Sequence, residues 1–200
     1  MKTSHFEKLV TIIKEMGVIR PRDLDVYGIP REYLRRLYAS GILERPVRGI
    51  YTLSTAEVTE HHSLIQVCKR VPRGVVCLLS ALRFFELTTQ SPHEIWIAID
   101  RKSRMPKADG LPLRIVRFSG EALQEGIEHH AVDGVEIKVY TLAKTIADCF
   151  KYRNKIGLDV ALEALRESRR DHLCTMDDIW HYAKICRVAN VMRPYLEALT

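Results

Sequence analysis

Residues 30–53 read PREYLRRLYASGILERPVRGIYTL, and this stretch decides the fold of the N-terminal part of the chain. In its first half, Leu34, Leu37 and Tyr38 recur at the three- and four-residue steps that place side chains on one face of a helix. We therefore expect a helix over Pro30–Ser40 with those three side chains facing the core. The charged residues between them must then project outward.

A β-hairpin is predicted directly after this helix. Gly41 ends the helix, and Ile42–Arg45 and Gly49–Leu53 have the composition of two short strands. The segment Pro46–Arg48 lies between them and is expected to form the turn. The opening stretch thus predicts a helix followed by a hairpin.

Two further helices are predicted upstream. The first has its apolar residues at helical spacing and is expected to end at Gly17; those residues are Phe6, Leu9, Val10, Ile13 and Met16. The second begins near Pro21, uses Leu24 as its core contact and stops at Gly28. Three helices and then a hairpin, with short connections, is the order of a winged helix-turn-helix, in which the third helix enters the major groove of DNA.

Seven arginines of this region are candidates for contact with DNA. On the third helix, Arg31 and Arg35 lie one turn apart, and a guanidinium can bind guanine O6 and N7 through two hydrogen bonds. The hairpin arginines are placed for a minor groove or the backbone, and those before Asp23 for phosphates. The full set is Arg20, Arg22, Arg31, Arg35, Arg36, Arg45 and Arg48. Two alternatives stay open: solvated charges without a ligand, and a winged-helix protein-interaction module without DNA binding.

The charge of the chain is concentrated in this region. The 200 residues carry a net charge of +6 with a pI near 9.1, and residues 1–53 hold ten lysines and arginines against six acidic residues. This balance favours an anionic partner such as nucleic acid. The five cysteines form no CxxC pair, which suits reduced thiols, and no apolar run reaches the ~18 residues of a membrane span. We expect a cytoplasmic protein without a membrane partner.

The remaining residues predict a larger α+β domain, so that the chain divides into residues 1–54 and 55–200. A helix is expected over Glu57–Val71, and Ser80 is expected to cap another. Two strongly apolar strands are predicted at Glu94–Asp100 and Leu113–Phe118.

A second hairpin and a helical C-terminal part follow these strands. Asp133-Gly134 is the strongest hairpin signal in the sequence, between strands that end at Val132 and begin at Val135. Four helices are expected after it: one capped by Thr141 and running to about Tyr152, then Asp159–Ser168, Met176–Ile185 and Val191–Leu199.

Several of these segments resemble AbiEi-family antitoxins. The similarity rests on loose patterns rather than invariant signatures and extends over most of the chain, through Gly28–Arg31, Leu43–Arg45, Arg48–Tyr51, Leu79–Leu82, the apolar strand before Asp100, and Val139–Arg153. The resemblance implies a transcriptional autorepressor and antitoxin of a type IV toxin-antitoxin system with a part in phage defence. Such a protein binds inverted repeats in double-stranded DNA upstream of its own operon. Its functional partner is a nucleotidyltransferase-like toxin, which it need not contact directly.

Three residues of the family-like block, Lys144, Asp148 and Arg153, are candidates for counteracting the toxin. Without the resemblance, their positions favour a purely structural role over contact with a toxin. On a helix with an apolar stripe at Leu142 and Ile146, they fall on or beside the solvated side, with Lys144 and Asp148 as an i,i+4 ion pair.

An enzyme is not expected. The strongest catalytic alternative is a metal-dependent nuclease that uses Asp100 and Lys102 at a strand end, but it needs a second carboxylate. Glu86 is available, whereas Glu94 lies at the far end of the same strand, roughly 20 Å away. The pairs His61-His62 and His129-His130 are adjacent in sequence and are poorly placed to chelate one ion. No nucleotide-binding or hydrolase motif is present, so we expect no metal and no cofactor.

Overall fold

The computed structural model describes residues 5–55, 61–90, 92–108 and 110–198. The chain is α+β, as predicted, and forms two compact units. Unit 1 comprises Met1–Pro72, Met105–Pro112 and His130–Ile137; unit 2 comprises Arg73–Arg104, Leu113–His129 and Lys138–Thr200. Unit 1 extends beyond Ser54, so the division into residues 1–54 and 55–200 stays a prediction.

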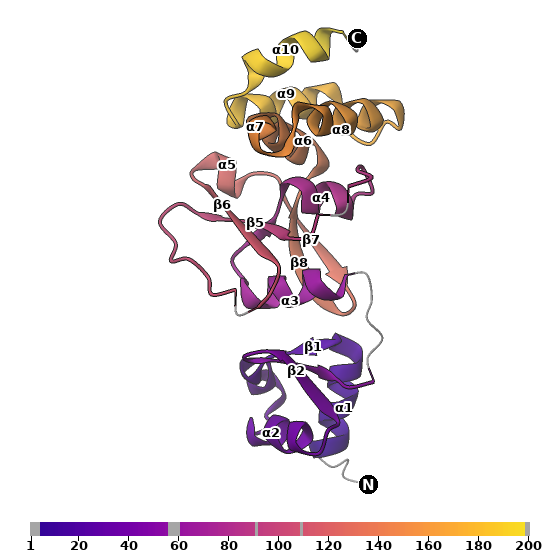
Figure 1. The fold of residues 1–200 in the computed structure, drawn as a ribbon, viewed down its shortest axis with the longest axis vertical. Coiled ribbons are helices and arrows are strands. Elements are labelled where there is room, and N and C mark those ends of the chain that lie inside the picture. Colours follow the sequence, from indigo (N-terminus) through magenta and orange to yellow (C-terminus); the bar gives the residue numbers. More distant parts are fainter. Residues whose placement is uncertain (1–4, 56–60, 91, 109, 199–200) are drawn as a thin grey trace. The chain divides into compact units, whose positions relative to one another are not determined.

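The N-terminal part of unit 1 contains the predicted three helices and hairpin in the predicted order (Figure 1). Its elements are α1 (His5–Met16), β1 (Val18–Ile19), the 3₁₀ helix η1 (Pro21–Tyr27), α2 (Glu32–Ala39), β2 (Leu43–Val47) and β3 (Ile50–Leu53). The short strand β1 is an addition to the prediction, and it pairs antiparallel with β3 to give the sheet order β1-β3-β2. Helix α3 (His62–Arg70) follows within unit 1, and the predicted start of this helix at Glu57 lies outside the described residues.

The helices of this region close over one apolar core. Its fully buried members include Leu9, Ile13, Leu24, Leu34 and Leu37, which the helical spacing predicted as inward. Burial of each such side chain contributes about 1.5–3 kcal/mol, so the spacing of leucine and isoleucine accounts for the packing of α1, η1 and α2.

Two local predictions for the hairpin region were wrong. The turn consists of Arg48 and Gly49, because Val47 pairs with Ile50 and Gly49 adopts the positive φ of 81° that a tight turn requires. Tyr38 was expected in the core, but 47% of it is exposed.

A second sheet has five strands in the order β6-β5-β4-β8-β7. Its strands are β4 (Val75–Val76), β5 (Ile95–Asp100), β6 (Leu113–Phe118), β7 (Ile127–Val132) and β8 (Val135–Tyr140), with α4 (Leu78–Phe84) and α5 (Glu121–Gln124) among them. Strand β5 is parallel to β6 and antiparallel to β4, which is itself parallel to β8. The strands predicted at Glu94–Asp100 and Leu113–Phe118 are thus confirmed, as is the Asp133-Gly134 turn, where both residues have positive φ.

One predicted helix cap was wrong. The N-cap of α4 is Cys77, and Ser80 lies inside the helix, where its Oγ accepts a hydrogen bond from the backbone N–H of Trp96 at 2.8 Å. A buried hydroxyl needs such a partner, and this bond ties α4 to the start of β5.

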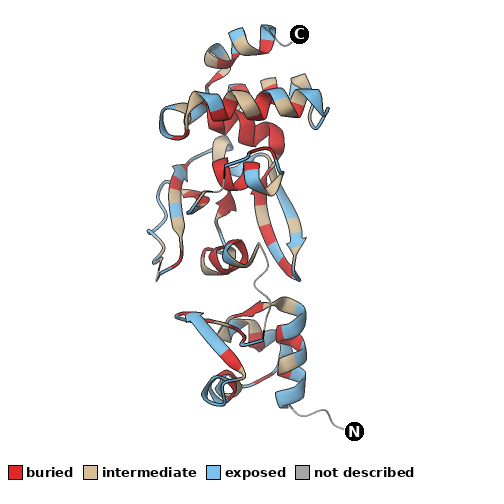
Figure 2. Cartoon of the chain, turned by 45° about the vertical axis from the view of Figure 1, so that its right-hand side comes forward, coloured by how far each residue is buried: buried red, intermediate tan, exposed pale blue. Residues whose placement is uncertain are grey.

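The helical C-terminal part packs around α6 (Figures 1 and 2). Its helices are α6 (Leu142–Lys151), α7 (Arg153–Ile156), α8 (Leu158–Arg170), α9 (Met176–Ile185) and α10 (Ala189–Glu197). Residues 142–150 are all buried, because α4, α8, α9 and α10 surround α6. The Thr141 side chain accepts a hydrogen bond from the Lys144 backbone N–H, which confirms the predicted cap. Across the described ranges, no helix has both the length and the apolar character needed to cross a bilayer.

Candidate nucleic-acid interface

Five of the predicted arginines lie exposed on α2, at its N-cap, and on the hairpin that follows it. We call them the arginine surface: Arg31, Arg35 and Arg36 from α2, and Arg45 and Arg48 from the hairpin. Arg31 is the N-cap of α2, so Arg35 follows it by one helical turn, as predicted. The outward orientation follows from the burial of Leu34 and Leu37 on the opposite side of the helix.

Tyr38 joins the two parts of this surface. Its ring packs edge-on against Tyr51 of β3, with the ring centroids 6.3 Å apart, and the Arg45 guanidinium lies 5.8 Å from its centre. This position explains why Tyr38 is exposed: it covers the join between α2 and the hairpin instead of entering the core. An aromatic residue two positions after the Arg35-Arg36 pair was the sequence signal that could have indicated it.

Within unit 1, the guanidinium groups of the arginine surface form only weak, solvent-exposed ion pairs or none. Arg31 pairs with Asp25 at 2.6 Å and Arg36 with Glu32 at 2.9 Å, but every partner is more than half exposed. The hydrogen bond to Asp25 raises the pKa of Arg31. Solvated pairs of this kind contribute at most about 1 kcal/mol, so a phosphate can replace the carboxylate. Arg35 and Arg48, like the exposed Arg22 of η1, have no ion pair within the described part of the chain.

Arg20 does not belong to this surface, which corrects the prediction that it faces phosphate. Its Nη2 and Nε donate to the Asp23 carboxylate, and its Nη1 donates to the Lys69 carbonyl at 2.6 Å. Only 18% of the Arg20 side chain is exposed, and Lys69 Nζ completes the cluster 3.2 Å from Asp23 Oδ2. Burial opposes ionisation of Asp23, but the hydrogen bonds and charges of Arg20 and Lys69 outweigh it and lower its pKa. Arg20 therefore has a structural role in unit 1.

Lys144 and Asp148 form the predicted i,i+4 ion pair, but the prediction that they lie on the solvated side of α6 was wrong. The two side chains are 0% and 1% exposed. Lys144 Nζ also lies 4.2 Å from the centre of the Tyr140 ring, and the Cys186 thiol donates to Asp148 at 3.2 Å. Burial raises the pKa of Asp148, although Lys144 and Cys186 oppose the shift. Side chains this deep cannot touch a partner protein while α6 stays packed.

Arg153, the third residue proposed to counteract a toxin, is half-buried after α6. Its Nη1 donates to the Phe150 carbonyl at 2.9 Å, which closes the end of that helix. The same carbonyl also accepts a backbone N–H at the C-cap, so Arg153 adds a second hydrogen bond to the end of α6.

The nuclease alternative gains no support from the geometry around Asp100. Asp100 Oδ1 accepts a hydrogen bond from the Lys102 backbone N–H at 2.7 Å, which closes a turn after β5. Glu94 at the other end of β5 pairs with Arg114 at 3.2 Å. In the ranges that the structure describes, no three His, Cys, Asp or Glu side chains gather closely enough to hold a metal ion.

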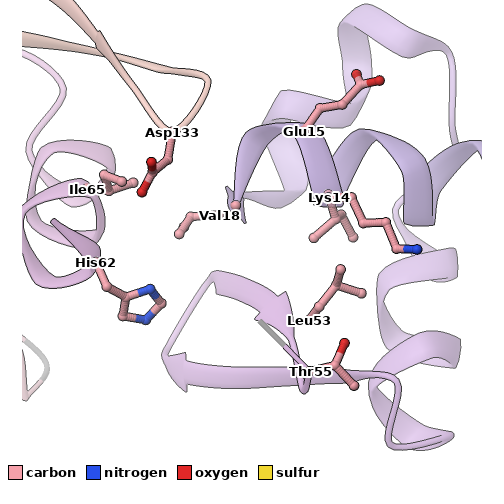
Figure 3. Close-up of a pocket in the computed structure, with 10 residues that line it drawn as sticks. Lys14, Glu15, Val18, Leu53, Thr55, His62, Ile65 and Asp133 are labelled. Carbon is pink, nitrogen blue, oxygen red and sulfur yellow. The ribbon is translucent and has the colours of Figure 1, made fainter. Parts of the chain in front are cut away.

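Unit 1 also contains a pocket of about 420 Å³ (Figure 3). Apolar side chains such as Val18, Leu53 and Ile65 share its lining with four charged or titratable residues: Lys14, Glu15, His62 and Asp133. Figure 3 shows the Lys14 amine directed away from His62 and Asp133. The lining combines one lysine, two carboxylates and a histidine with apolar side chains, and we assign it no ligand.

Comparisons with known proteins concern the fold of the chain and the family of its N-terminal segment. In structure, the chain is similar to the RV2827C protein from Mycobacterium tuberculosis, with a TM-score of 0.60 at 14% sequence identity over 98% of this chain and 80% of that chain. At this identity the likeness concerns the fold alone. No curated protein matches the chain in sequence. A family described as "Transcriptional regulator, AbiEi antitoxin" does match, over residues 7–54. For this segment, which contains the whole arginine surface, the resemblance to AbiEi antitoxins is therefore confirmed.

Proposed function

We propose that the N-terminal part of unit 1 is a winged helix-turn-helix that binds duplex DNA, with α2 in the major groove and the β2–β3 hairpin as the wing. The observation that carries the proposal is the arginine surface itself. The Arg45 guanidinium of the hairpin lies against the Tyr38 ring, and Tyr38 follows Arg35 by three residues on α2, so both lie on the same side of that helix.

The arginines have different chemical roles in this proposal. Arg31 and Arg35 can bind a guanine edge through two hydrogen bonds each, which supplies sequence preference of about 1–3 kcal/mol per contact. Arg48 at the hairpin turn and Arg22 on η1 reach phosphates, which supply affinity without sequence preference. Arg36 and Arg45 add positive charge and aromatic stacking beside them.

We further propose that the protein is a transcriptional autorepressor and the antitoxin of a type IV system. The family match over residues 7–54 supports this function, since it covers the proposed DNA-binding part. The DNA partner would be inverted repeats upstream of the protein's own operon, and the functional partner a nucleotidyltransferase-like toxin, with or without direct contact. In this proposal the chain is a cytoplasmic regulator without catalytic activity.

Binding to duplex DNA from the region upstream of the gene is the direct test. Fluorescence anisotropy with the full chain should show affinity that falls by about 100-fold or more between 50 and 200 mM salt, as expected when roughly four phosphates lose their counterions. A shuffled duplex of equal length should bind more weakly than the upstream one. Equal affinity for both duplexes, or binding that is insensitive to salt, would contradict the proposal; a protein-interaction module predicts indifference to DNA.

Arg20 and Arg22 provide a matched pair of variants, two residues apart, with the same change of charge. Arg22→Gln should weaken DNA binding several-fold and reduce the slope of log affinity against log salt by about 1, because one phosphate contact is lost. Arg20→Gln should leave the DNA affinity and the salt slope nearly unchanged. It should lower the melting temperature, because it breaks the cluster with Asp23 and the Lys69 carbonyl. The reverse pattern would show that the assignment of these two residues is wrong.

A further inference from the structure

Unit 2 contains a cavity of about 650 Å³ whose lining is dominated by positive charge. Three separate segments contribute to it: the end of β6 through the start of α5, the end of α6 with the residue after it, and the end of α9 with Arg187 two residues later. Its basic side chains are Arg117, Lys151, Lys184 and Arg187, and Glu121 is the acidic one. We call it the basic cavity. Its volume falls in the range of about 300–1,000 Å³ typical of sites for small molecules.

The charges of the basic cavity are not neutralised from within the protein. Lys151, Lys184 and Arg187 are exposed and form no ion pair with any carboxylate that the structure describes, Glu121 included. The C-terminal third of the chain carries little net charge, with eleven basic against nine acidic residues in positions 134–200. Positive charge is therefore concentrated at the cavity, and this local excess points to an anionic ligand.

Arg117 is held in place by the turn that follows β5. Its Nη1 donates to the carbonyls of Asp100, Arg101 and Ser103 at 3.3, 2.8 and 2.9 Å. Its Nε and Nη2 have no hydrogen-bond partner in the described ranges. An arginine whose orientation is already fixed loses less entropy when it binds a ligand oxygen, so Arg117 is preorganised for this role.

Arg187 occupies a backbone position that favours glycine. It follows α9 with a φ of 58°, and the chain around it forms the helix-ending bonds from Arg187 N–H to Lys184 and from Val188 N–H to Ala183. The left-handed conformation is unfavourable for a residue with a Cβ atom and is most often filled by glycine at this point of a helix end. The sequence has instead an arginine here, which places a fourth cation at the basic cavity.

We propose that the basic cavity binds an oligophosphate, either pyrophosphate or the phosphate tail of a nucleoside triphosphate. Four cations and one carboxylate leave three positive charges, which match the three to four negative charges of such a group near neutral pH. Lys151, Lys184 and Arg187 would contact phosphate oxygens, and the free Nε and Nη2 of Arg117 would donate to them. The ring of Tyr152, half-buried in the lining, offers a surface for a nucleobase.

The lysines also lie at helix ends, where a cation stabilises the helix dipole. Lys151 is in the last turn of α6 and Lys184 in the last turn of α9. That role alone requires neither the basic residue at the strained position 187 nor the anchored Arg117, and it predicts no saturable binding of phosphate. The proposal does not depend on DNA binding, because the basic cavity lies wholly within unit 2 and the arginine surface within unit 1.

Isothermal titration calorimetry of the full chain with pyrophosphate and, separately, with ATP tests the proposal. We expect saturable binding to at least one of them with a dissociation constant below about 1 mM, in a buffer whose ionic strength is matched with chloride. The Lys184→Gln/Arg187→Gln variant should bind at least tenfold more weakly. The Arg166→Gln/Arg193→Gln variant removes the same charge from exposed positions outside the cavity and should bind within twofold of the wild type.

Arg187→Gly separates loss of the site from loss of folding. Because glycine is favoured at this φ, the variant should keep or raise the melting temperature measured without ligand, while its affinity for the oligophosphate falls. Absence of saturable binding to both probes, or equal binding by the Lys184→Gln/Arg187→Gln variant, would overturn the proposal. Binding of a single-stranded oligonucleotide through these residues, with neither probe bound, would also overturn it.

Discussion

Replacing Arg31 and Arg35 by glutamate should abolish specific binding of the upstream duplex, with a loss of affinity of about 1,000-fold or more. Each arginine supplies about 1–3 kcal/mol if it contacts a guanine edge, and each glutamate adds repulsion from the phosphates. Both positions are exposed on α2, and the Arg31–Asp25 pair is more than half solvated, so the fold should tolerate the change. Fluorescence anisotropy gives the affinity, and circular dichroism checks that the helices remain.

A matched control distinguishes this surface from the overall charge of the protein. Lys8→Glu/Lys14→Glu changes the net charge by the same amount at exposed positions of α1 that do not belong to the arginine surface. Its affinity should fall by less than about tenfold, as expected when the changed charges do not contact the DNA and act only through screened repulsion. Comparable losses in the two double variants would mean that the arginine surface has no special role.

Lys144→Met should be the most destabilising single substitution among those considered, at about 3–5 kcal/mol near pH 7. It removes the cation that compensates Asp148 in a site where both side chains are essentially inaccessible to water. In a chain of this size the loss corresponds to a fall of roughly 10 °C in melting temperature. Urea denaturation followed by circular dichroism measures the free energy of unfolding.

The pH dependence of this variant identifies the cause. Burial already raises the pKa of Asp148 in the wild type, and loss of Lys144 raises it further. The folded variant then holds the proton of Asp148 more tightly than the unfolded chain does, so its stability is greatest below the unfolded pKa of about 3.9 and falls as the pH rises towards the folded pKa. The deficit relative to the wild type should therefore shrink on acidification.

A double variant completes the test of the buried pair. Lys144→Met/Asp148→Leu removes both charges and replaces them with apolar side chains, which often costs little in a packed interior. It should recover at least half of the stability that Lys144→Met loses. A double variant as unstable as the single one would show that packing around α6, rather than the unpaired carboxylate, causes the loss.

The apolar spacing of the sequence was sufficient to predict most helices and strands. Leu34 and Leu37 define the inward face of α2, and Asp133-Gly134 with the alternation of Val135–Tyr140 after it defines the second hairpin. Such patterns are local, because the 3.6-residue period of a helix and the two-residue period of a strand can be recognised within one segment of sequence. The outward direction of Arg31 and Arg35 follows from the same periods.

What lies against each face was decided only by the tertiary structure. Arg20 and Arg22 look equivalent in the sequence. In the structure, however, Arg20 donates a hydrogen bond to the carbonyl of Lys69, 49 residues away, whereas Arg22 stays exposed. The spacing of Lys144 and Asp148 predicted their pairing but placed them in water, whereas α4, α8, α9 and α10 enclose all sides of α6. Periodicity orients a side chain relative to its own helix or strand; whether solvent or another segment meets it there depends on long-range packing, which no local pattern encodes.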